Sequence, residues 1–223
     1  MFSIYSIAFN VVKNDFAYEE AIENFCNFAE EVIVAVNKSD DNTWEEFKRL
    51  DEKYNNLKII PATVDLDDPR LDGKLFNLAL QATTQEFKIL GGLDHRFCLC
   101  QKPEWEQAAY KLRFTELDGF LIPVLDLWGD ERSVRWDDES NVQMMWFLHK
   151  GGLCRDSSSL IHENGDVAKA QPYLLGSVKS LEEYLDTLSK QNLFVYHTGY
   201  ANFDTRVKVN KDIWQKQWEE IRP

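Results

Sequence analysis

Residues 32–47 read VIVAVNKSDDNTWEEF, an apolar β-branched run followed by a polar loop and the start of an amphipathic segment. The run has the composition of a buried strand, and Thr43 and Glu46 have capping-box spacing, which predicts a helix beginning there. A buried strand that leads into a helix is the repeating unit of α/β proteins with parallel sheets. This stretch therefore predicts an α/β fold, provided that the unit recurs on both sides.

The unit does recur in the flanking sequence. FSIYSIAF (2–9) predicts a strand, and Asn14-Asp15 predicts the N-cap of the helix that follows it. Downstream, a strand, a helix and a strand are predicted at LKIIPA (57–62), GKLFNLALQAT (73–83) and FKILGG (87–92). The order βαβαβαβ predicts a Rossmann-like, mostly parallel sheet flanked by helices.

The second half of the chain is less regular. The patterns predict helices at 103–112, after the Ser180/Glu183 capping box and at 212–221, and strands at 119–128 and 192–200; MMWFL (144–148) is apolar without clear periodicity. We expect one domain over residues 1–223. The chain ends at WEEIRP without a polar tail, as expected of a domain cut from a longer protein.

Composition narrows the function classes. A net charge of −13 and a pI near 4.8 would repel nucleic acid, which is bound through an excess of Lys and Arg. Four cysteines without a CxxC pair indicate reduced thiols. No signal peptide or membrane-length apolar run occurs, so we expect a soluble, cytoplasmic protein without a membrane span.

Candidate ligand-binding residues follow the predicted parallel strands, whose carboxyl ends meet at one edge of the sheet. These positions hold Asn10, Asn37-Lys38, the acidic run DLDD (65–68) and Asp94-His95-Arg96. Neither GxGxxG nor GxxxxGK[ST] follows the first strand, so the glycine-rich phosphate cradle of those motifs is missing. A phosphate group bound at this edge would therefore need a cation.

Several segments resemble family 2 glycosyltransferases of the GT-A fold. The similar stretches are SIYSIAFNVVKNDF (3–16), EEVIVAVNKSDDNT (30–43), GKLFNLALQATTQEFKILGGLDHRF (73–97), SLIHENGD (159–166) and FVYHTGY (194–200). The resemblance implies transfer of a sugar from a nucleotide-diphosphate sugar to a hydroxyl of a glycan or protein acceptor, with inversion. It also implies a nucleotide-sugar-binding half over about 1–100 and an acceptor half over about 101–223.

The resemblance assigns roles to individual residues. Asp94 and His197 would bind a divalent metal, Mn²⁺ or Mg²⁺, that neutralises the leaving diphosphate. Glu163 would be the catalytic base, with Asp156 as the second choice. The candidate donor contacts are Phe9, Asn10, Asn37, Lys38, Lys74, Asn77, Arg96 and Arg206. Lys74 and Asn77 could equally form the polar face of an amphipathic helix, and Arg206 could belong to a solvated basic run.

The sequence departs from the family's Asp-x-Asp metal motif, because Arg96 occupies the position of the second acid. Asp94 and His197 could still bind a metal, or the Arg96 guanidinium could pair with the diphosphate in its place. Asp65 and Asp67 form a competing Asp-x-Asp one strand earlier. A non-catalytic sugar- or partner-binding domain of the same fold is the main alternative function. A nucleotidyltransferase and a metal hydrolase have less motif support.

Overall fold

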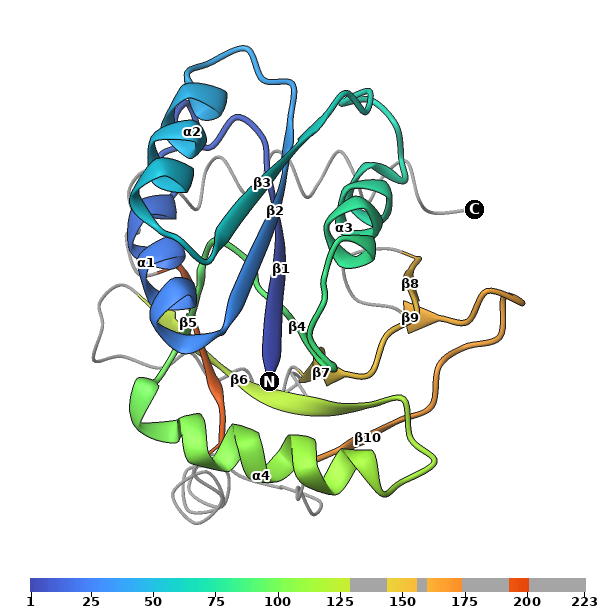
Figure 1. Cartoon of the computed structure of the whole chain (residues 1–223). Helices are drawn as coiled ribbons and strands as arrows, with labels where there is room; N and C mark the ends of the chain where they lie inside the picture. Colours follow the sequence, from blue (N-terminus) through green and yellow to red (C-terminus); the bar gives the residue numbers. More distant parts are fainter. Residues whose placement is uncertain (129–143, 156–159, 174–192, 201–223) are drawn as a thin grey trace.

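The computed structural model describes residues 1–128, 144–155, 160–173 and 193–200, which are coloured in Figure 1. The elements are β1 (Phe2–Ala8), α1 (Tyr18–Phe28), β2 (Glu31–Asn37), α2 (Thr43–Lys53), β3 (Leu57–Ala62), α3 (Leu71–Gln81), β4 (Phe87–Leu90), β5 (His95–Phe97), η1 (Leu99–Gln101), α4 (Lys102–Arg113), β6 (Gly119–Trp128), β7 (Met144–His149), β8 (Leu153–Cys154), β9 (Leu160–Ile161), β10 (Ala170–Pro172) and β11 (Val195–Tyr200). None of the helices within these ranges is long and apolar enough to cross a bilayer.

Most of the strands join one mixed sheet in the order β3-β2-β1-β4-β7-β6-β11-β5, with β10 beside β6. The four strands of the repeating unit pair in parallel, as predicted from the sequence. β7 runs antiparallel between β4 and β6, and β11 then runs parallel to β6. The predicted α/β fold with a mostly parallel sheet is therefore confirmed.

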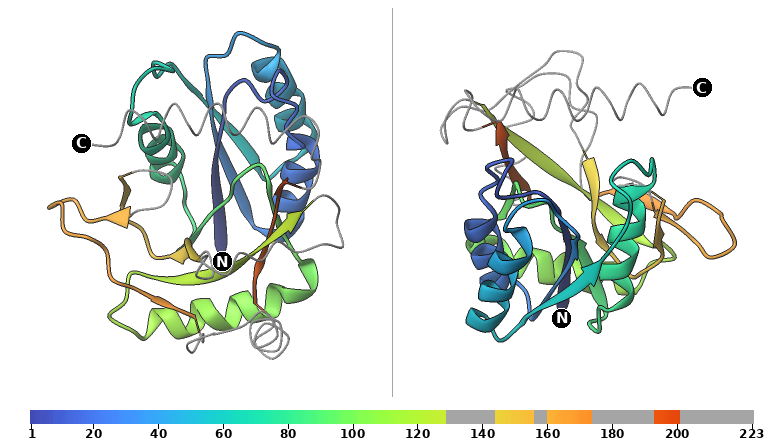
Figure 2. Two further views of the ribbon diagram at one scale, coloured as in Figure 1. Left: turned by 180° about the vertical axis from the view of Figure 1, so that it is seen from behind. Right: turned by 90° about the horizontal axis from the view of Figure 1, so that it is seen from above.

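Helices cover the sheet on both faces. α1 and α2 lie on one face, α3 lies on the other, and α4 crosses below the sheet in the view of Figure 1; Figure 2 shows the same layers from behind and from above. Each face has its own core: Phe25, Phe47 and Trp105 belong to the α1/α2/α4 side, and Leu75 and Phe76 belong to the α3 side. The β-branched runs of β1 and β2 are buried on both faces, which explains why they read as continuous apolar stretches.

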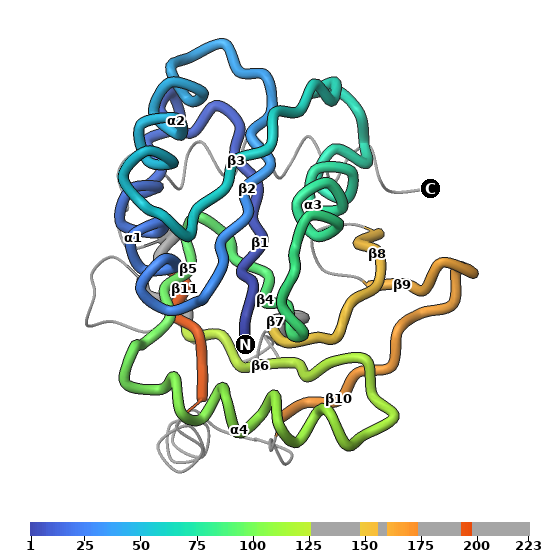
Figure 3. The backbone as a smooth tube through the Cα atoms, viewed as in Figure 1, coloured from blue at the N-terminus to red at the C-terminus, as the bar shows by residue number. Residues whose placement is uncertain are grey.

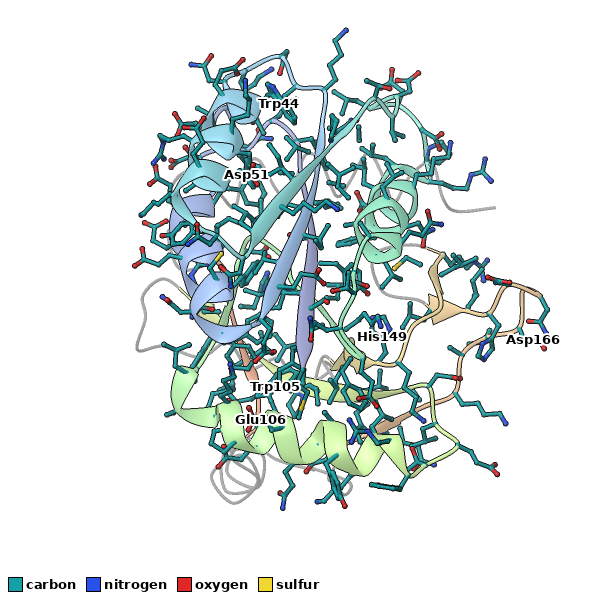
Figure 4. All side chains as sticks on the ribbon, in the orientation of Figure 1. Trp44, Asp51, Trp105, Glu106, His149 and Asp166 are labelled. Atoms are coloured by element: carbon teal, nitrogen blue, oxygen red, sulfur yellow. The ribbon has the colours of Figure 1, made fainter. Side chains whose placement is uncertain are left out.

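The short strand β5 is held by aromatic packing. Phe97, which is 1% exposed, stacks on Phe28 at a centroid distance of 5.0 Å and meets Trp105 edge-on at 5.5 Å. In Figure 4, Trp105 points from α4 toward the sheet. Asn24 of α1 adds a pair of hydrogen bonds to the backbone of Phe97, at 2.7 and 2.9 Å. A strand of three residues thereby gains a defined position between α1 and α4.

Helix boundaries agree with the sequence prediction to within a few residues, but both predicted N-caps in the first half are wrong. α1 begins at Tyr18, and Asp15 instead occupies a left-handed turn conformation with φ 50°. Thr43 is the first residue of α2, and its hydroxyl accepts a hydrogen bond from the Val11 N–H at 2.9 Å. The Thr43 hydroxyl thus connects the loop after β1 to the start of α2. The helices predicted after Ser180 and at 212–221 lie outside the described residues.

A buried polar pair joins the two halves of the sheet. The Tyr5 hydroxyl of β1 lies 2.9 Å from Nε2 of His149 at the end of β7, and both residues are fully buried. His149 Nδ1 faces the Gly151 carbonyl at 3.3 Å, so Nδ1 carries the proton and Nε2 accepts from Tyr5. Burial lowers the pKa of His149 to about 3, although the Gly151 carbonyl partly opposes this shift. No sequence motif around His149 predicted that it would form a buried hydrogen bond with Tyr5.

His149 makes the stability of the fold sensitive to acid. The unfolded histidine binds a proton below its ordinary pKa of about 6.5, whereas the folded one binds it only near 3, so stability falls as the pH drops through this window. Between about pH 7.5 and pH 5, wild type should lose about 2 kcal/mol more than His149→Gln. Urea unfolding at both pH values measures this difference. Tyr5→Phe keeps the buried imidazole and should keep the wild-type pH dependence; equal losses in all three proteins would contradict the assignment.

Candidate functional site

The loops after β1 and β2 are fastened to each other at the carboxyl edge of the sheet. The Asn10 N–H donates to the Ser39 hydroxyl, and the Asn10 side-chain oxygen accepts from the Asp40 N–H, both at 3.0 Å. Asn10 has φ 49°, a left-handed conformation that asparagine tolerates better than most residues. Phe9 packs on the α3-side core, and Lys38 is exposed. The predicted donor contacts Phe9, Asn10 and Lys38 thus share one edge of the sheet.

Two glycines form the turn that follows β4. A Cβ on Gly91 would lie 2.8 Å from the Ile4 side chain and 3.0 Å from that of Phe25, so the turn packs tightly on the core. A Cβ on Gly92 would lie 2.6 Å from Asp94 Oδ1 and 2.9 Å from the His95 ring. Gly92 therefore lets the backbone approach the two side chains that follow it more closely than any other residue would.

Asp94, His95 and His197 form a compact cluster, and it is the one such group of three potential metal ligands found in the described parts of the chain. Their ligand atoms lie within 4.8 Å of one another. Asp94 Oδ2 is 3.0 Å from His197 Nε2, and Asp94 Oδ1 is 3.7 Å from His95 Nε2. Antiparallel pairing of β5 with β11, in which His95 faces His197, brings these residues together (Figure 3).

The cluster favours the ionised form of Asp94. Burial raises the pKa of this carboxyl group, but the electrostatic interactions with His197 and His95 and the hydrogen bond from His197 outweigh burial and hold the pKa well below its usual range. The carboxylate is therefore available as an anionic ligand across the physiological pH range.

His95 has a defined tautomer. The Gly92 N–H lies 2.8 Å from His95 Nδ1, and because a backbone N–H can only donate, Nδ1 must accept. The ring proton then sits on Nε2, on the side of Asp94. His95 thus directs an N–H toward the carboxylate, and the hydrogen bond at Nδ1 fixes the orientation of its ring. Sequence reasoning did not single it out from its neighbours.

Arg96 braces the turn that carries Asp94. Its terminal nitrogens donate to the carbonyls of His95 at 2.8 Å, Leu93 at 3.2 Å and Ala17 at 2.9 Å. These bonds tie the turn to the loop before α1. The guanidinium therefore has a structural role that the sequence prediction of a phosphate contact did not include.

Two of the predicted donor contacts, Asn37 and Asn77, instead hydrogen-bond to the backbone of distant segments. The Asn37 amide exchanges two hydrogen bonds with the backbone of Val64, at 2.8 and 2.9 Å, and Asn37 is 1% exposed. The Asn77 amide makes the same pair with Cys154, at 2.7 and 2.8 Å, which joins α3 to β8. Since both ends of each amide are used, these asparagines hold distant segments together instead of facing a ligand. Lys74, the remaining helix candidate, is paired with Asp68.

The competing acidic run DLDD forms an exposed turn. Asp65 Oδ1 accepts from the Asp67 N–H at 3.1 Å, and the Asp65 carbonyl accepts from the Asp68 N–H at 3.1 Å. These local bonds are those of an Asx turn. Asp65 and Asp67 do not belong to the Asp94 cluster, so the turn interpretation is favoured over a metal site.

Glu163 lies far from the Asp94 cluster. Its neighbour His162 places Nε2 3.1 Å from Asp118, the residue before β6, whereas His197 pairs with Asp126 near the other end of β6. Eight residues of strand span about 26 Å at roughly 3.3 Å per residue. Figures 1 and 2 agree, because the loop between β9 and β10 lies across the molecule from β5 and β11, and Figure 4 labels Asp166 at its tip. The structure does not bring Glu163 to the predicted site.

Asp156 and Arg206 lie outside the described residues. The chain just before Asp156 can be placed, because a Cβ on Gly73 would lie 2.5 Å from the carbonyl oxygen of Arg155. Gly73 belongs to the first turn of α3, which follows β3 at the carboxyl edge of the sheet. Arg155 therefore reaches the same edge as the strand-end loops.

The sequence matches no known family profile and no curated protein. Among solved structures, the described fold is similar to residues 1–349 of S. aureus TarS, with 16% identity, a TM-score of 0.48 and coverage of 87% of this chain and 57% of TarS. It is also similar to the Pyrobaculum calidifontis mannosyltransferase PcManGT in complex with GDP-Man and Mn²⁺, with 18% identity, a TM-score of 0.41 and coverage of 57% and 35%.

A third similar structure is a nucleotidyl transferase from Methanothermobacter, with 10% identity, a TM-score of 0.38 and coverage of 97% of this chain and 99% of that one. The chain spans less than two thirds of the length of TarS and of PcManGT. These similar structures include both a mannosyltransferase and a nucleotidyl transferase. At identities this low, the activity of a similar structure cannot be assigned to this chain. The chemistry of the site is therefore inferred from its own residues.

Gly92 should be needed for the geometry of the cluster. Gly92→Ala would push Asp94 Oδ1 and the His95 ring from their positions, so any affinity of the cluster for Mn²⁺ should fall about 10- to 100-fold, as for other losses of ligand support. Loss of the free Mn²⁺ signal in electron paramagnetic resonance titrations measures the affinity. Gly165→Ala is the control, since φ 88° makes it a strained substitution in the distant β9–β10 loop. Equal affinity in Gly92→Ala and wild type would contradict this geometry.

Proposed function

We propose that this protein transfers a sugar from a nucleotide-diphosphate sugar to a hydroxyl of a glycan or protein acceptor, with inversion and with a divalent metal at Asp94 and His197. The observation that carries the proposal is the 3.0 Å contact between Asp94 Oδ2 and His197 Nε2. These two residues are 103 positions apart, and the sequence resemblance had paired them as metal ligands. Their contact at the carboxyl edge of the sheet supports that pairing.

The donor set fits a metal ion. Two neighbouring ligands at about 2.1 Å from an octahedral ion lie about 3.0 Å apart, which matches the Asp94–His197 spacing. A carboxylate with an imidazole suits Mn²⁺ better than Mg²⁺, whose protein ligands are oxygens. Bound there, such an ion would neutralise the charge that develops on the leaving diphosphate.

The chain's own residues prepare the site. His197 and His95 keep Asp94 ionised, and Arg96 holds the turn on which Asp94 stands. Two lysines near the edge are already paired with acids, Lys13 with Asp40 and Lys74 with Asp68. In a protein of net charge −13, a diphosphate would depend on a cation supplied locally. This balance favours the metal interpretation over replacement of the metal by Arg96.

We assign the base to Asp156 rather than Glu163. An acceptor hydroxyl must lie within hydrogen-bond reach of the group that takes its proton. Arg155 lies at the carboxyl edge of the sheet, whereas Glu163 sits beside His162 and Asp118 near the opposite edge. One observation still supports the alternative of a non-catalytic sugar- or partner-binding domain. Arg96 replaces the second acid of the Asp-x-Asp metal motif.

Donor binding should require Asp94 and His197. In thermal-shift titrations with UDP- and GDP-sugars, wild type should be stabilised by one donor only when Mn²⁺ is present, because a ligand that binds the folded state raises the melting temperature. Asp94→Asn and His197→Ala should lose this shift, and the matched control His162→Ala should keep it. Stabilisation that survives EDTA but disappears in Arg96→Ala would overturn the metal assignment. Donor binding without sugar transfer or hydrolysis would favour the non-catalytic domain.

Substitutions of Asp156 and Glu163 should have different effects on the turnover rate. Removal of a general base lowers the rate by about 10²- to 10⁴-fold. We expect a loss of this size in kcat for Asp156→Asn, with donor binding retained, and a change of less than about twofold for Glu163→Gln. Release of nucleoside diphosphate measures both rates. The opposite ranking would show that Glu163 reaches the acceptor.

A further inference from the structure

We propose that Arg96 is a positioning residue through which metal binding at Asp94 orders the loop after β1, residues 9–17. The inference rests on the proposed metal site and deepens it, because it connects the metal to a loop that is predicted to contact the donor. Coupling between two binding sites is reciprocal. A donor that binds this loop would therefore strengthen metal binding by the same factor.

The Arg96 guanidinium binds the backbone on both sides of Asp94. One terminal nitrogen donates to the carbonyl of Leu93, the residue before Asp94, at 3.2 Å, and to the carbonyl of His95, the residue after it, at 2.8 Å. These bonds restrain the turn from which the carboxylate projects. A planar guanidinium suits this task, because its N–H groups point in fixed directions, whereas a lysine ammonium is a point charge on a flexible stem.

The same guanidinium reaches the end of the loop after β1. Its other terminal nitrogen donates to the Ala17 carbonyl at 2.9 Å, although the two residues are 79 positions apart. Ala17 is the N-cap of α1, and its carbonyl also accepts the Ala21 N–H at 3.1 Å. Arg96 therefore links the Asp94 turn to the point at which the loop becomes a helix.

Internal hydrogen bonds make the loop a compact unit. The Asn14 N–H donates to the Asn10 carbonyl at 3.1 Å, and the Phe16 N–H donates to the Val11 carbonyl at 3.0 Å. At its beginning, the loop is fastened to α2 by the bond from the Val11 N–H to the Thr43 hydroxyl, at 2.9 Å. Because these bonds join the two ends of the loop, a restraint at its last residue reaches its first residues.

Metal binding supplies such a restraint. A carboxylate that binds a metal is held in one position, so binding removes conformational freedom from the Asp94 turn. Through the carbonyl bonds of Arg96, this loss of freedom extends to the loop after β1. Val12, Lys13 and Asp15 of the loop are exposed, and exposed loops open at low free energy. Hydrogen exchange of the loop amides can therefore report the coupling.

Hydrogen-exchange mass spectrometry of the full chain, with and without saturating Mn²⁺, tests the proposal. In wild type, bound Mn²⁺ should slow exchange in peptides from residues 10–17 by about fivefold or more, the lower end of coupling between two sites. Mn²⁺-saturated Arg96→Lys should keep the slowing in peptides from residues 91–98 and lose it in residues 10–17. Arg113→Lys is the matched control, since it removes a guanidinium paired with Glu86 on the surface, and it should behave as wild type does.

The coupling can also be measured from the loop side. Thr43→Val removes the acceptor of the Val11 N–H and leaves Arg96 and the metal ligands intact. It should weaken Mn²⁺ binding about fivefold in wild type, by reciprocity, and have no further effect in Arg96→Lys. The free Mn²⁺ signal in electron paramagnetic resonance gives these affinities. Unchanged affinity in Thr43→Val would contradict the coupling even if Arg96→Lys does not fold.

The outcomes separate this inference from the proposed function. Bound Mn²⁺ that leaves exchange of residues 10–17 unchanged, or slowing that persists in Arg96→Lys, would overturn the coupling and leave the proposed transfer reaction intact. Absence of Mn²⁺ binding in wild type would overturn both the coupling and the metal site on which it rests.

Discussion

The antiparallel pairing of β5 with β11 is the constraint on which the candidate site depends. β5 has only three residues, and its register sets His95 against His197 and Arg96 against Tyr196. Because β11 also pairs with β6, the same register connects the turn after β4 to the second half of the sheet. The packing of Phe97 between Phe28 and Trp105 holds β5 in place. The position of Asp94 is therefore a consequence of core packing as much as of the turn.

The charged side chains near the carboxyl edge of the sheet surround the site that the β5–β11 pairing forms. The protein is strongly acidic, and two of the lysines near the carboxyl edge are engaged by Asp40 and Asp68. Asp94 is ionised beside two imidazoles, which creates a small region where anionic and basic ligands meet. Such a region can attract a divalent ion and, through the ion, an anionic substrate. The same acidic surface would oppose direct binding of a diphosphate.

Local pattern predicted the architecture well. The apolar runs of β1, β2 and β3 and the intervening helices follow from periodicity, and their parallel pairing follows from the crossover helices. The errors lie where a polar side chain had two possible partners. Thr43 looked like a cap, but its hydroxyl accepts from the Val11 N–H, 32 positions away. Helix propensity and capping patterns depend only on residues close in sequence. They cannot take account of a hydrogen-bond partner that is distant in sequence, such as the Val11 N–H.

The sequence by itself determined the α/β class, the alternation of strands and helices in the first half and, through its resemblance to a family, the choice of Asp94 and His197 as partners. Only the tertiary structure decided the roles of the remaining polar residues. It used the Asn37 and Asn77 amides as backbone clasps, turned Arg96 onto three carbonyls and left Glu163 near the opposite edge of the sheet. The physical reason is that a polar side chain takes its role from the partner it meets, and these partners are set by long-range register and packing.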